Sequence, residues 1–318
     1  MKRLIAGLSL LISLAAQAQS AVTADPKLPE YKAQAGITGN LNSIGSDTLN
    51  NLMTFWAESF RKIYPNVKIQ IEGKGSSTAP PALIAGTAQL GPMSREMKAT
   101  ELDGFEKKFG YKPRAVAVAL DGLAVFVNKD NPLKSMTLAQ ADAIFSATRK
   151  RGGEAITTWG QLGLTGEWAN RPISLYGRNS ASGTYGYFKE HVLKGGDYAG
   201  TVKEQPGSAS VVQGIEKELG GIGYSGIGYA TSGVRALPIA ESATAIEPNY
   251  ENVESFKYPI ARYLYVYLNV PPAGPDKLTC EFIKYVISKA GQADTIKDGY
   301  FPLSSKAAAK SLADSGCK

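Results

Sequence analysis

The chain has 318 residues, of which 43% are hydrophobic, with 35 basic and 28 acidic side chains, two Cys and one His. This composition is that of a globular protein long enough for two domains, and it argues against a disordered, collagen-like or coiled-coil chain. Because His191 is the only imidazole and there are only two Cys, multi-His metal centres, zinc ribbons and iron–sulfur clusters are excluded.

The first twenty residues have the pattern of a secretory signal peptide. Lys2 and Arg3 precede the apolar stretch 4–15, and residues 16–18 (Ala-Gln-Ala) fit the small-x-small cleavage pattern. A membrane anchor is the alternative, but this stretch is too short for a hydrocarbon core, which needs about 20 residues. We expect cleavage after Ala18 and export, which leaves a formal charge of +5, that is +7 less the two removed cations.

The positive charge of the mature chain is spread along the sequence. No dense run of Lys and Arg is present, which, together with export, argues against nucleic acid as a partner. A small anionic ligand makes better use of a modest positive field.

The two cysteines, Cys280 and Cys317, lie near the C-terminus. In an oxidising compartment a lone pair of this kind most simply forms one disulfide, which would tie down the end of the chain. Two separate thiols are the alternative.

The first third of the chain repeats a strand, a loop and a helix. Apolar residues at helical spacing run from 49 to 63, Pro65 ends them, and Ser46 or Asp47 is suited to cap the helix. The repeated pattern indicates an α/β fold with helices over a largely parallel sheet. The predicted elements are a strand within 36–45, a helix at 49–63, a strand at 67–71, a helix after the loop 73–78, a strand at 90–93, a helix at 100–109, and strands at 114–120 and 123–127.

The pattern continues through the rest of the chain, and no repeat typical of a solenoid is present. Thr137 and Ser208 are each placed to cap a helix. The predicted elements are helices at 137–146, 184–193 and 211–219, strands at 173–176, 221–224 and 258–269, and C-terminal helices that begin near Asp276 and Ser304.

Three predicted helix starts carry hydroxyl side chains beside glycine, in the loops 45–48, 75–78 and 180–184. Free backbone N–H groups, the positive end of the helix dipole and hydroxyl donors make such loops suited to an anion, although a simple capping role is the alternative. Arg178 and Arg95 each lie near the end of a strand, where ligands bind in open α/β sheets. Surface ion pairing is the alternative for both arginines.

Sequence signs of catalysis are weak. Residues 73–76 invert the Walker order, and residues 223–227 lack the last glycine of G-x-S-x-G. His191 lies in a predicted helix, where a surface position is the simplest interpretation. We therefore expect no enzyme activity.

Four segments together resemble the PstS family, the phosphate-binding proteins of phosphate-specific ABC transporters. They are G-S-D-T at 45–48, G-S-S at 75–77, R-x-x-x-S-G-T at 178–184 and Y-P-I-A-R-Y-L-Y at 258–265. The resemblance covers about residues 36–305, and the R-x-x-x-S-G-T loop is its most specific part. It implies a type II periplasmic binding protein: two α/β lobes joined by crossover hinge strands, with the ligand between them. Such a protein is a monomer without cofactor that delivers phosphate to membrane permease subunits.

By the same resemblance, one lobe comprises residues 36–121 and 262–318 and the other residues 122–261. The hinge strands would then lie near Asp121 and Arg262.

The resemblance also implies residues that contact phosphate, and these are Asp47, Thr48, Ser76, Arg178, Ser182, Gly183 and Thr184. Ser46, Ser94, Arg95 and Asp121 complete the predicted set. Many family members have Asp where this chain has Ser94, so another carboxylate must accept the phosphate proton. We expect Asp121, which interrupts an apolar strand pair, with Asp47 as the second choice; Asp121 as a buried acceptor satisfied by backbone donors is the alternative. A carboxylate accepts a hydrogen bond from HPO4²⁻ but repels sulfate, which has no proton to give.

Two other functions are compatible with the pattern. A receptor for another oxyanion, such as sulfate, would not need a carboxylate in the site. An exported phosphate-ester hydrolase would need a nucleophile or a metal, and the chain supplies neither convincingly.

Overall fold

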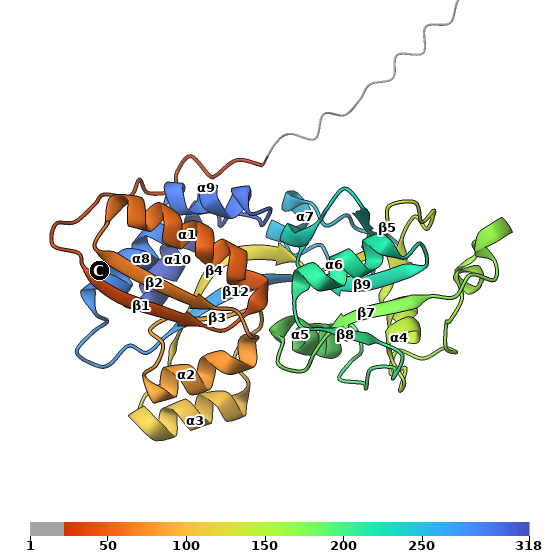
Figure 1. Cartoon of the computed structure of the whole chain (residues 1–318), viewed down its shortest axis with the longest axis horizontal. Helices are drawn as coiled ribbons and strands as arrows, with labels where there is room; N and C mark the ends of the chain where they lie inside the picture. Colours follow the sequence, from red (N-terminus) through yellow and green to blue (C-terminus); the bar gives the residue numbers. More distant parts are fainter. Residues whose placement is uncertain (1–21, 318) are drawn as a thin grey trace, which may run out of the picture.

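The computed structural model describes residues 22–317, so the predicted signal peptide and its cleavage after Ala18 lie outside the described residues. Two α/β lobes lie next to each other along the long axis of the molecule (Figure 1). Between residues 22 and 317, no helix combines the length and apolar character needed to cross a bilayer.

The sheet of the first lobe is built from two parts. A single bridge between Ser43 and Leu90 joins a parallel two-stranded part to an antiparallel three-stranded part. In spatial order its strands are β2 (Val67–Glu72), β1 (Gly39–Ile44), β3 (Gly91–Met93), β12 (Ala261–Leu268) and β4 (Arg114–Gly122).

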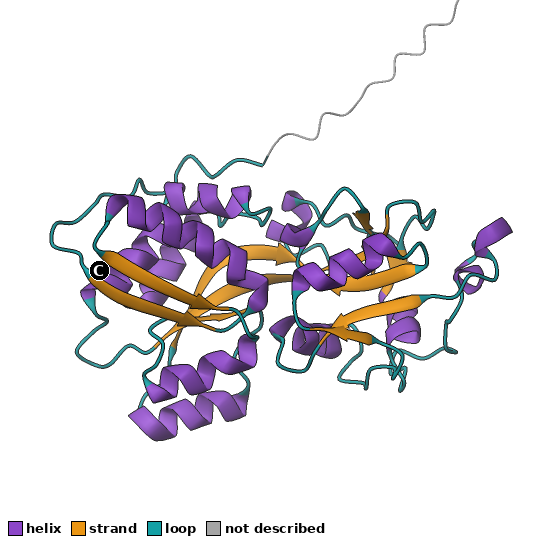
Figure 2. Ribbon diagram, in the orientation of Figure 1, coloured by secondary structure: helices purple, strands orange, loops and turns teal. Residues whose placement is uncertain are grey.

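Helices flank this sheet (Figure 2). The first of them buries the stripe of Leu52, Met53, Trp56 and Phe60, as its helical spacing predicts. The helices are α1 (Asn50–Ile63), α2 (Ala79–Ala85), α3 (Ala99–Phe109), α8 (Lys277–Val286), α9 (Lys289–Lys297) and α10 (Ser305–Ser315), with short 3-10 turns η1 (Asp47–Leu49) and η2 (Ser76–Thr78).

The second lobe has a five-stranded sheet and a small two-stranded one. In spatial order the larger sheet contains β10 (Val234–Ala236), β5 (Ala124–Asn128), β9 (Gly221–Ser225), β7 (Ser174–Arg178) and β8 (Lys203–Gln205). The smaller sheet pairs β6 (Met136–Thr137) with β11 (Ile239–Ala240). The helical elements are α4 (Leu138–Phe145), α5 (Gly183–His191), α6 (Ser208–Lys217), α7 (Tyr250–Glu254), η3 (Trp159–Leu162), η4 (Gly166–Trp168) and η5 (Ile227–Tyr229).

The expectation of a largely parallel sheet is wrong, because the larger sheet of each lobe is mixed. β4 continues into β5 and takes the chain from the first lobe to the second, and β12 brings it back in the opposite direction. Each crossing strand therefore adds antiparallel pairs, β12 with β3 and β4, and β5 with β9 and β10. Local periodicity reports that a segment is a strand but not the direction of its neighbour.

The predicted disulfide between Cys280 and Cys317 is confirmed. It joins α8 to the residue that follows the C-cap of α10. The bridge therefore ties the C-terminal helix to the helices of the first lobe.

Removal of this disulfide is expected to lower the stability of the protein substantially. The chain-entropy model assigns roughly 4 kcal/mol to a loop of this size, which corresponds to a fall in Tm on the order of 10 °C. Thermal unfolding of the double variant Cys280→Ser, Cys317→Ser measures the effect. A reducing agent should destabilise the native chain and leave the variant unaffected, whereas equal Tm values for the two proteins would contradict the prediction.

Candidate functional site

Five hydroxyl side chains from distant parts of the sequence form one buried cluster where the lobes meet. They belong to Ser46, Thr48, Ser76, Ser94 and Thr184, and none is more than 2% exposed. The Oγ1 atoms of Thr48 and Thr184, which belong to different lobes, are 2.8 Å apart, and the Oγ of Ser46 donates to the Oγ of Ser94 at 3.1 Å. The Oγ of Ser76 accepts from the backbone N of Ser94 at 3.0 Å. Five of the residues predicted from the sequence therefore meet at one place, which we call the hydroxyl cluster.

The loop 45–48 reaches the cluster because glycine begins it. A Cβ at Gly45 would lie 2.1 Å from the carbonyl oxygen of Pro92, so only glycine allows this approach to the end of β3. The backbone N of Ser46 donates to the same carbonyl oxygen at 2.8 Å. The expectation that Ser46 or Asp47 caps the helix is wrong, because neither side chain makes a capping hydrogen bond. Both side chains are engaged in the site instead.

The start of α5 brings the second lobe to the cluster. Ser182 is the N-cap of α5, and its Oγ accepts from the backbone N of Thr184 and of Tyr185. A Cβ at Gly183 would lie 2.3 Å from the Oγ of Ser76 and 2.7 Å from the Oγ of Ser94. Glycine at this position is therefore what allows the helix to contact the hydroxyls of the first lobe.

Arg178 is buried at the end of β7, with only 1% of its surface exposed. Its Nη1 donates to the Oγ of Ser208 at 2.7 Å and lies 3.1 Å from the Oδ1 of Asp47, and its Nη2 donates to the carbonyl of Pro206. Burial lowers the pKa of Arg178, and the charge of Asp47 opposes this effect. Its Nε is buried and has no hydrogen-bond partner among the described residues. A buried donor without a partner is uncommon and marks a place where a ligand or water belongs.

The Tyr224 side chain holds the backbone of Arg178 in place. Its hydroxyl accepts from the backbone N of Arg178 at 3.2 Å, and its ring stacks on Phe188 with centroids 4.1 Å apart. Phe188 belongs to α5, so the helix that supplies Thr184 also supports the strand that supplies Arg178.

Asp47 connects the first lobe to the start of α6. Its Oδ1 accepts from the backbone N of Ser208 at 2.7 Å, while no donor in the described chain bonds its Oδ2. The expectation that Ser208 caps α6 through its side chain is wrong, because Gly207 is the N-cap and the Oγ of Ser208 accepts from Arg178. Ser208 is therefore a site residue outside the predicted set, and the signal for it in the sequence is a third Gly-Ser pair at a helix start.

Asp121 is fully buried and pairs with Arg262 on the neighbouring strand. Its Oδ2 accepts from the Nε and Nη2 of Arg262 at 2.9 and 2.6 Å, and its Oδ1 accepts from the backbone N of Ile227 at 2.9 Å. Protein donors thus engage both carboxylate oxygens, which corresponds to the alternative of a satisfied buried acceptor. Arg262 was not among the predicted site residues, although it interrupts an apolar strand just as Asp121 does.

Arg95 lies outside the hydroxyl cluster. Its guanidinium pairs with both carboxylate oxygens of Glu101 at 2.8 and 2.7 Å and donates to the Oγ of Ser77. Burial acts to raise the pKa of Glu101, but hydrogen bonds from Arg95 and from the backbone of Lys98 bring that pKa below its ordinary value. Arg95 is therefore in the ion pair that was the alternative to anion binding.

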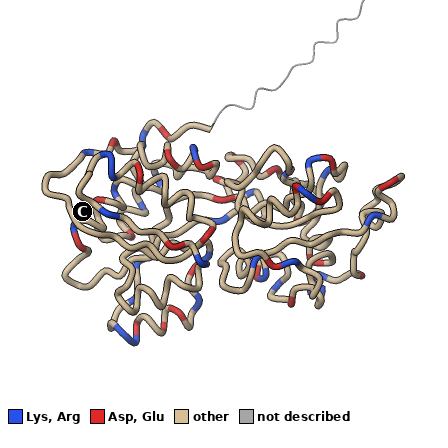
Figure 3. Tube along the Cα trace, viewed as in Figure 1, with Lys and Arg blue, Asp and Glu red and all other residues tan. Residues whose placement is uncertain are grey.

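The remaining titratable side chains of the described residues do not gather into a metal centre. No group of three metal-ligating side chains gathers within residues 22–317. His191 is exposed at the end of α5 and stacks on Tyr187. Basic and acidic residues alternate over both lobes, in agreement with the spread of charge in the sequence (Figure 3).

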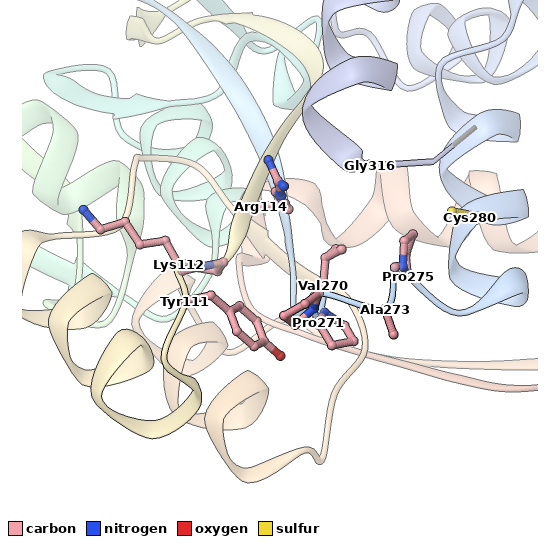
Figure 4. Close-up of a pocket in the computed structure, with 12 residues that line it drawn as sticks. Tyr111, Lys112, Arg114, Val270, Pro271, Ala273, Pro275, Cys280 and Gly316 are labelled. Carbon is pink, nitrogen blue, oxygen red and sulfur yellow. The ribbon is translucent and has the colours of Figure 1, made fainter.

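Two cavities differ in their relation to the cluster. One of about 690 Å³ is lined from both lobes, by Arg95 and Arg262 of the site region and by Tyr187 of α5. Another of about 790 Å³ lies beside Cys280 and is lined by Lys112 and the segment 270–275 (Figure 4). Of these two cavities, only the one of about 690 Å³ is lined by residues of the site region, Arg95 and Arg262.

Asp298 is half-buried at the contact between the lobes, and its Oδ2 atom is fully buried. A Cβ at Gly228 of η5 would lie 2.9 Å from its carbonyl oxygen, so the two segments pack tightly. Burial raises the pKa of Asp298 to about 7, and its Oδ2 has no hydrogen-bond partner within the described part of the chain.

This carboxyl predicts a pH-dependent stability. Because its pKa rises from 3.8 when exposed to about 7 in the folded chain, the folded state holds a proton that the unfolded state releases. Its contribution to stability is fully present at low pH and is lost as the pH rises through about 7. Asp298→Asn should therefore raise Tm at pH 8, with a difference that shrinks toward pH 4. Asp103→Asn, at an exposed position of α3, is the control, and a constant difference for Asp298→Asn at all pH values would contradict the prediction.

Two α/β lobes, two strands that cross between them and a buried polar cluster at their contact define a two-lobed solute-binding protein. A model of the PBP superfamily domain matches residues 31–290. The chain is 55% identical to the phosphate-binding protein PstS of Pseudomonas aeruginosa over 320 residues, 99% of each chain. The chain belongs to the PstS family of the PBP superfamily.

One more distant relative and two solved structures are also similar to this chain. Protein SphX of Synechococcus elongatus is 29% identical over 83% of this chain and 77% of its own. A putative phosphate ABC transporter substrate-binding protein from Clostridium perfringens, solved with bound phosphate, is 25% identical with a TM-score of 0.71, over 83% of this chain and 100% of its own. An ABC-type phosphate transport receptor from Vibrio cholerae shares the fold, with a TM-score of 0.64 at 23% identity over the same shares.

Proposed function

We propose that this protein binds inorganic phosphate, as HPO4²⁻, between its two lobes in the periplasm and delivers it to the permease of a phosphate ABC transporter. The observation that carries the proposal is the buried Nε of Arg178, which has no hydrogen-bond partner in the described chain. The same guanidinium contacts Asp47, which belongs to the loop that supplies Ser46 and Thr48 to the hydroxyl cluster. Arginine donors match the oxygens of a phosphate. The names of the relatives, a phosphate-binding protein and a transporter component, support the same ligand and partner.

The donors to phosphate in this proposal come from both lobes. They are the guanidinium of Arg178, the backbone N of Gly183 and the hydroxyls of Ser46, Thr48, Ser76, Ser94 and Thr184. Three residues of the predicted set then act through other residues. Ser182 bonds the backbone of α5, Arg95 pairs with Glu101, and Asp121 pairs with Arg262.

Asp47 is the carboxylate that we assign to the phosphate proton. It lies 3.1 Å from Arg178 and has one oxygen without a donor, whereas both oxygens of Asp121 accept from the protein. HPO4²⁻ can donate its single proton to Asp47, while sulfate would meet a repelling charge. Asp47, which the sequence pattern ranked second to Asp121, is thus the carboxylate that we propose as the proton acceptor.

Lobe closure is the proposed conformational step. The lobes correspond to residues 36–121 with 262–318, and 122–261, and they hinge where β4 leads into β5 and where β12 returns. Only the closed form brings Thr48 to Thr184 and Asp47 to Arg178, so a ligand that contacts both lobes favours it. Exclusion of water on closure strengthens the charge-assisted hydrogen bonds. The protein then binds and releases phosphate as a monomer without catalysis, cofactor or nucleic acid.

Calorimetric titration of the mature, ligand-stripped protein with phosphate at neutral pH tests the proposal. We expect tight one-to-one binding that persists in a large excess of sulfate. An absence of phosphate binding would refute the ligand, and easy displacement by sulfate would favour a receptor for another oxyanion. Release of phosphate from an ester by the same preparation would instead support a hydrolase.

The proton acceptor is tested by two matched variants. Asp47→Asn should raise the affinity for sulfate relative to phosphate, because an amide no longer repels a fully ionised anion. Asp121→Asn should leave this ratio close to that of the native chain. If Asp121→Asn raises the affinity for sulfate relative to phosphate and Asp47→Asn does not, Asp121 is the proton acceptor.

A further inference from the structure

Arg262 makes hydrogen bonds to three separate parts of the molecule. It bonds Asp121 through its Nε and Nη2. In addition, its Nη1 donates to the backbone carbonyl of Ser94 at 2.7 Å, and its Nη2 donates to the Oγ1 of Thr184 at 3.0 Å. Its side chain is 2% exposed, and its guanidinium lies 5.2 Å from the centre of the Tyr187 ring. One buried side chain on a crossing strand therefore contacts the first lobe, the second lobe and the other crossing strand.

The bond to Thr184 determines where the proton of that hydroxyl can point. A guanidinium has only donors, so its N–H occupies a lone pair of the Thr184 oxygen. The hydroxyl must then donate its own proton away from Arg262. The other side-chain oxygens within hydrogen-bond distance of the Thr184 Oγ1 belong to Thr48 at 2.8 Å and Ser94 at 3.4 Å, both in the hydroxyl cluster.

The charge of Arg262 is already balanced by its pair with Asp121. Two N–H groups of Arg262 bond one carboxylate oxygen of Asp121, and the pair is buried on adjacent strands where Arg262 lies opposite Asp121 in the register. Direct attraction between Arg262 and an anion is therefore largely offset by Asp121. The influence of Arg262 on a ligand must come mainly through the groups that it holds.

We propose that Arg262 is a positioning residue that makes the Thr184 hydroxyl a hydrogen-bond donor toward the bound anion. This inference rests on the proposed phosphate site and names a residue that orders it. Without Arg262, the Thr184 hydroxyl can rotate and offer a lone pair to the anion, which is repulsive. The Asp121–Arg262 pair in turn fixes the guanidinium relative to both crossing strands, so the hinge sets the orientation of a donor in the site.

A double-mutant cycle measured by phosphate calorimetry tests the proposal. Arg262→Lys retains a cation for Asp121, but its single ammonium lacks the planar fork that reaches Asp121, Ser94 and Thr184 together. We expect Arg262→Lys to raise the phosphate Kd about tenfold in the native background. In a Thr184→Val background, which lacks the hydroxyl, the same change should alter Kd less than about twofold, because coupled residues give non-additive effects. An equal loss in both backgrounds, or no loss in the native one, would overturn the proposal.

A charge-neutral pair of changes covers the case in which Arg262→Lys does not fold. Asp121→Asn with Arg262→Gln leaves no unpaired buried charge, and its effect on Kd should likewise disappear in the Thr184→Val background. An effect of equal size in both backgrounds overturns the proposal here too. Arg235→Lys is the matched control, since Arg235 is part-buried, donates to the carbonyls of Asn131 and Leu133, and has no contact with the hydroxyl cluster. It should leave Kd unchanged.

The same titrations separate this proposal from the proposed function. If the native chain does not bind phosphate, the proposed function fails and so does this inference with it. If the native chain binds phosphate and the cycle shows no coupling, only the role of Arg262 fails. Urea unfolding of each variant checks that the affinities are measured on folded protein.

Discussion

Arg178→Ala is expected to raise the dissociation constant for phosphate by about thirtyfold to several thousandfold. The substitution removes a buried guanidinium whose Nε has no other partner in the described chain and leaves the Asp47 carboxylate without its cation. Truncation of one member of a buried charged contact costs about 2 to 5 kcal/mol, and each 1.4 kcal/mol is about a tenfold change in Kd. Calorimetric titration with phosphate measures the effect.

Two further variants show whether the effect of Arg178 is specific. Arg178→Lys keeps the charge but not the planar donor set, so its Kd should lie between those of the native chain and of Arg178→Ala. Arg61→Ala removes an exposed arginine of α1 and should not change Kd. A Kd for Arg178→Ala within about threefold of the native value would rule out the proposed site.

Gly183→Ala should cause a second large loss of phosphate affinity, on the order of a hundredfold. Its Cβ would lie 2.3 Å from the Oγ of Ser76, a distance that real Cβ atoms do not reach, so the α5 start must withdraw from the first lobe. Withdrawal separates the donors of the two lobes and admits water to the site, which weakens each remaining hydrogen bond. The overlap is with side chains of the other lobe, so the folding of each lobe should be little affected.

Gly104→Ala is the matched control for this substitution. Gly104 lies within α3, and its added Cβ would meet only the Ile84 Cδ1 at 3.9 Å, an ordinary contact. Alanine in a helix interior is favourable by about 1 kcal/mol relative to glycine, so this variant should be at least as stable as the native chain and bind phosphate equally well. Native affinity for Gly183→Ala would show that the lobes do not close through this contact.

Helix boundaries were largely predictable from the sequence because local residues determine them. Thr137 caps α4 as expected, with its side chain accepting from the backbone N of Gln140. Gly110 ends α3 in the left-handed conformation that favours glycine. Ser46 and Ser208 carry the same kind of local signal as Thr137, yet neither side chain caps its helix, because partners from distant segments bond them instead.

The roles of the charged residues show where local patterns stop being informative. Arg95 and Arg178 both follow short strands and look alike in the sequence. The first turn of α3 places Glu101 against Arg95, whereas Arg178 keeps a donor without a partner among the described residues. Asp121 and Arg262 each interrupt an apolar strand, so their pairing was detectable as two opposite charges on the two predicted crossing strands. No local signal identified which carboxylate has a free oxygen.

The sequence by itself determined the family, the loops that supply hydroxyls and arginine, and the disulfide, since each depends on residue type and spacing along the chain. The tertiary structure decided the strand directions, the partners of each charge and the choice of Asp47 over Asp121 as the proposed proton acceptor. The Asp47 side chain bonds the backbone of Ser208, 161 positions away, and Arg262 bonds Asp121, 141 positions away. Electrostatic and hydrogen-bond partners depend on separation in space, which the order of residues does not contain.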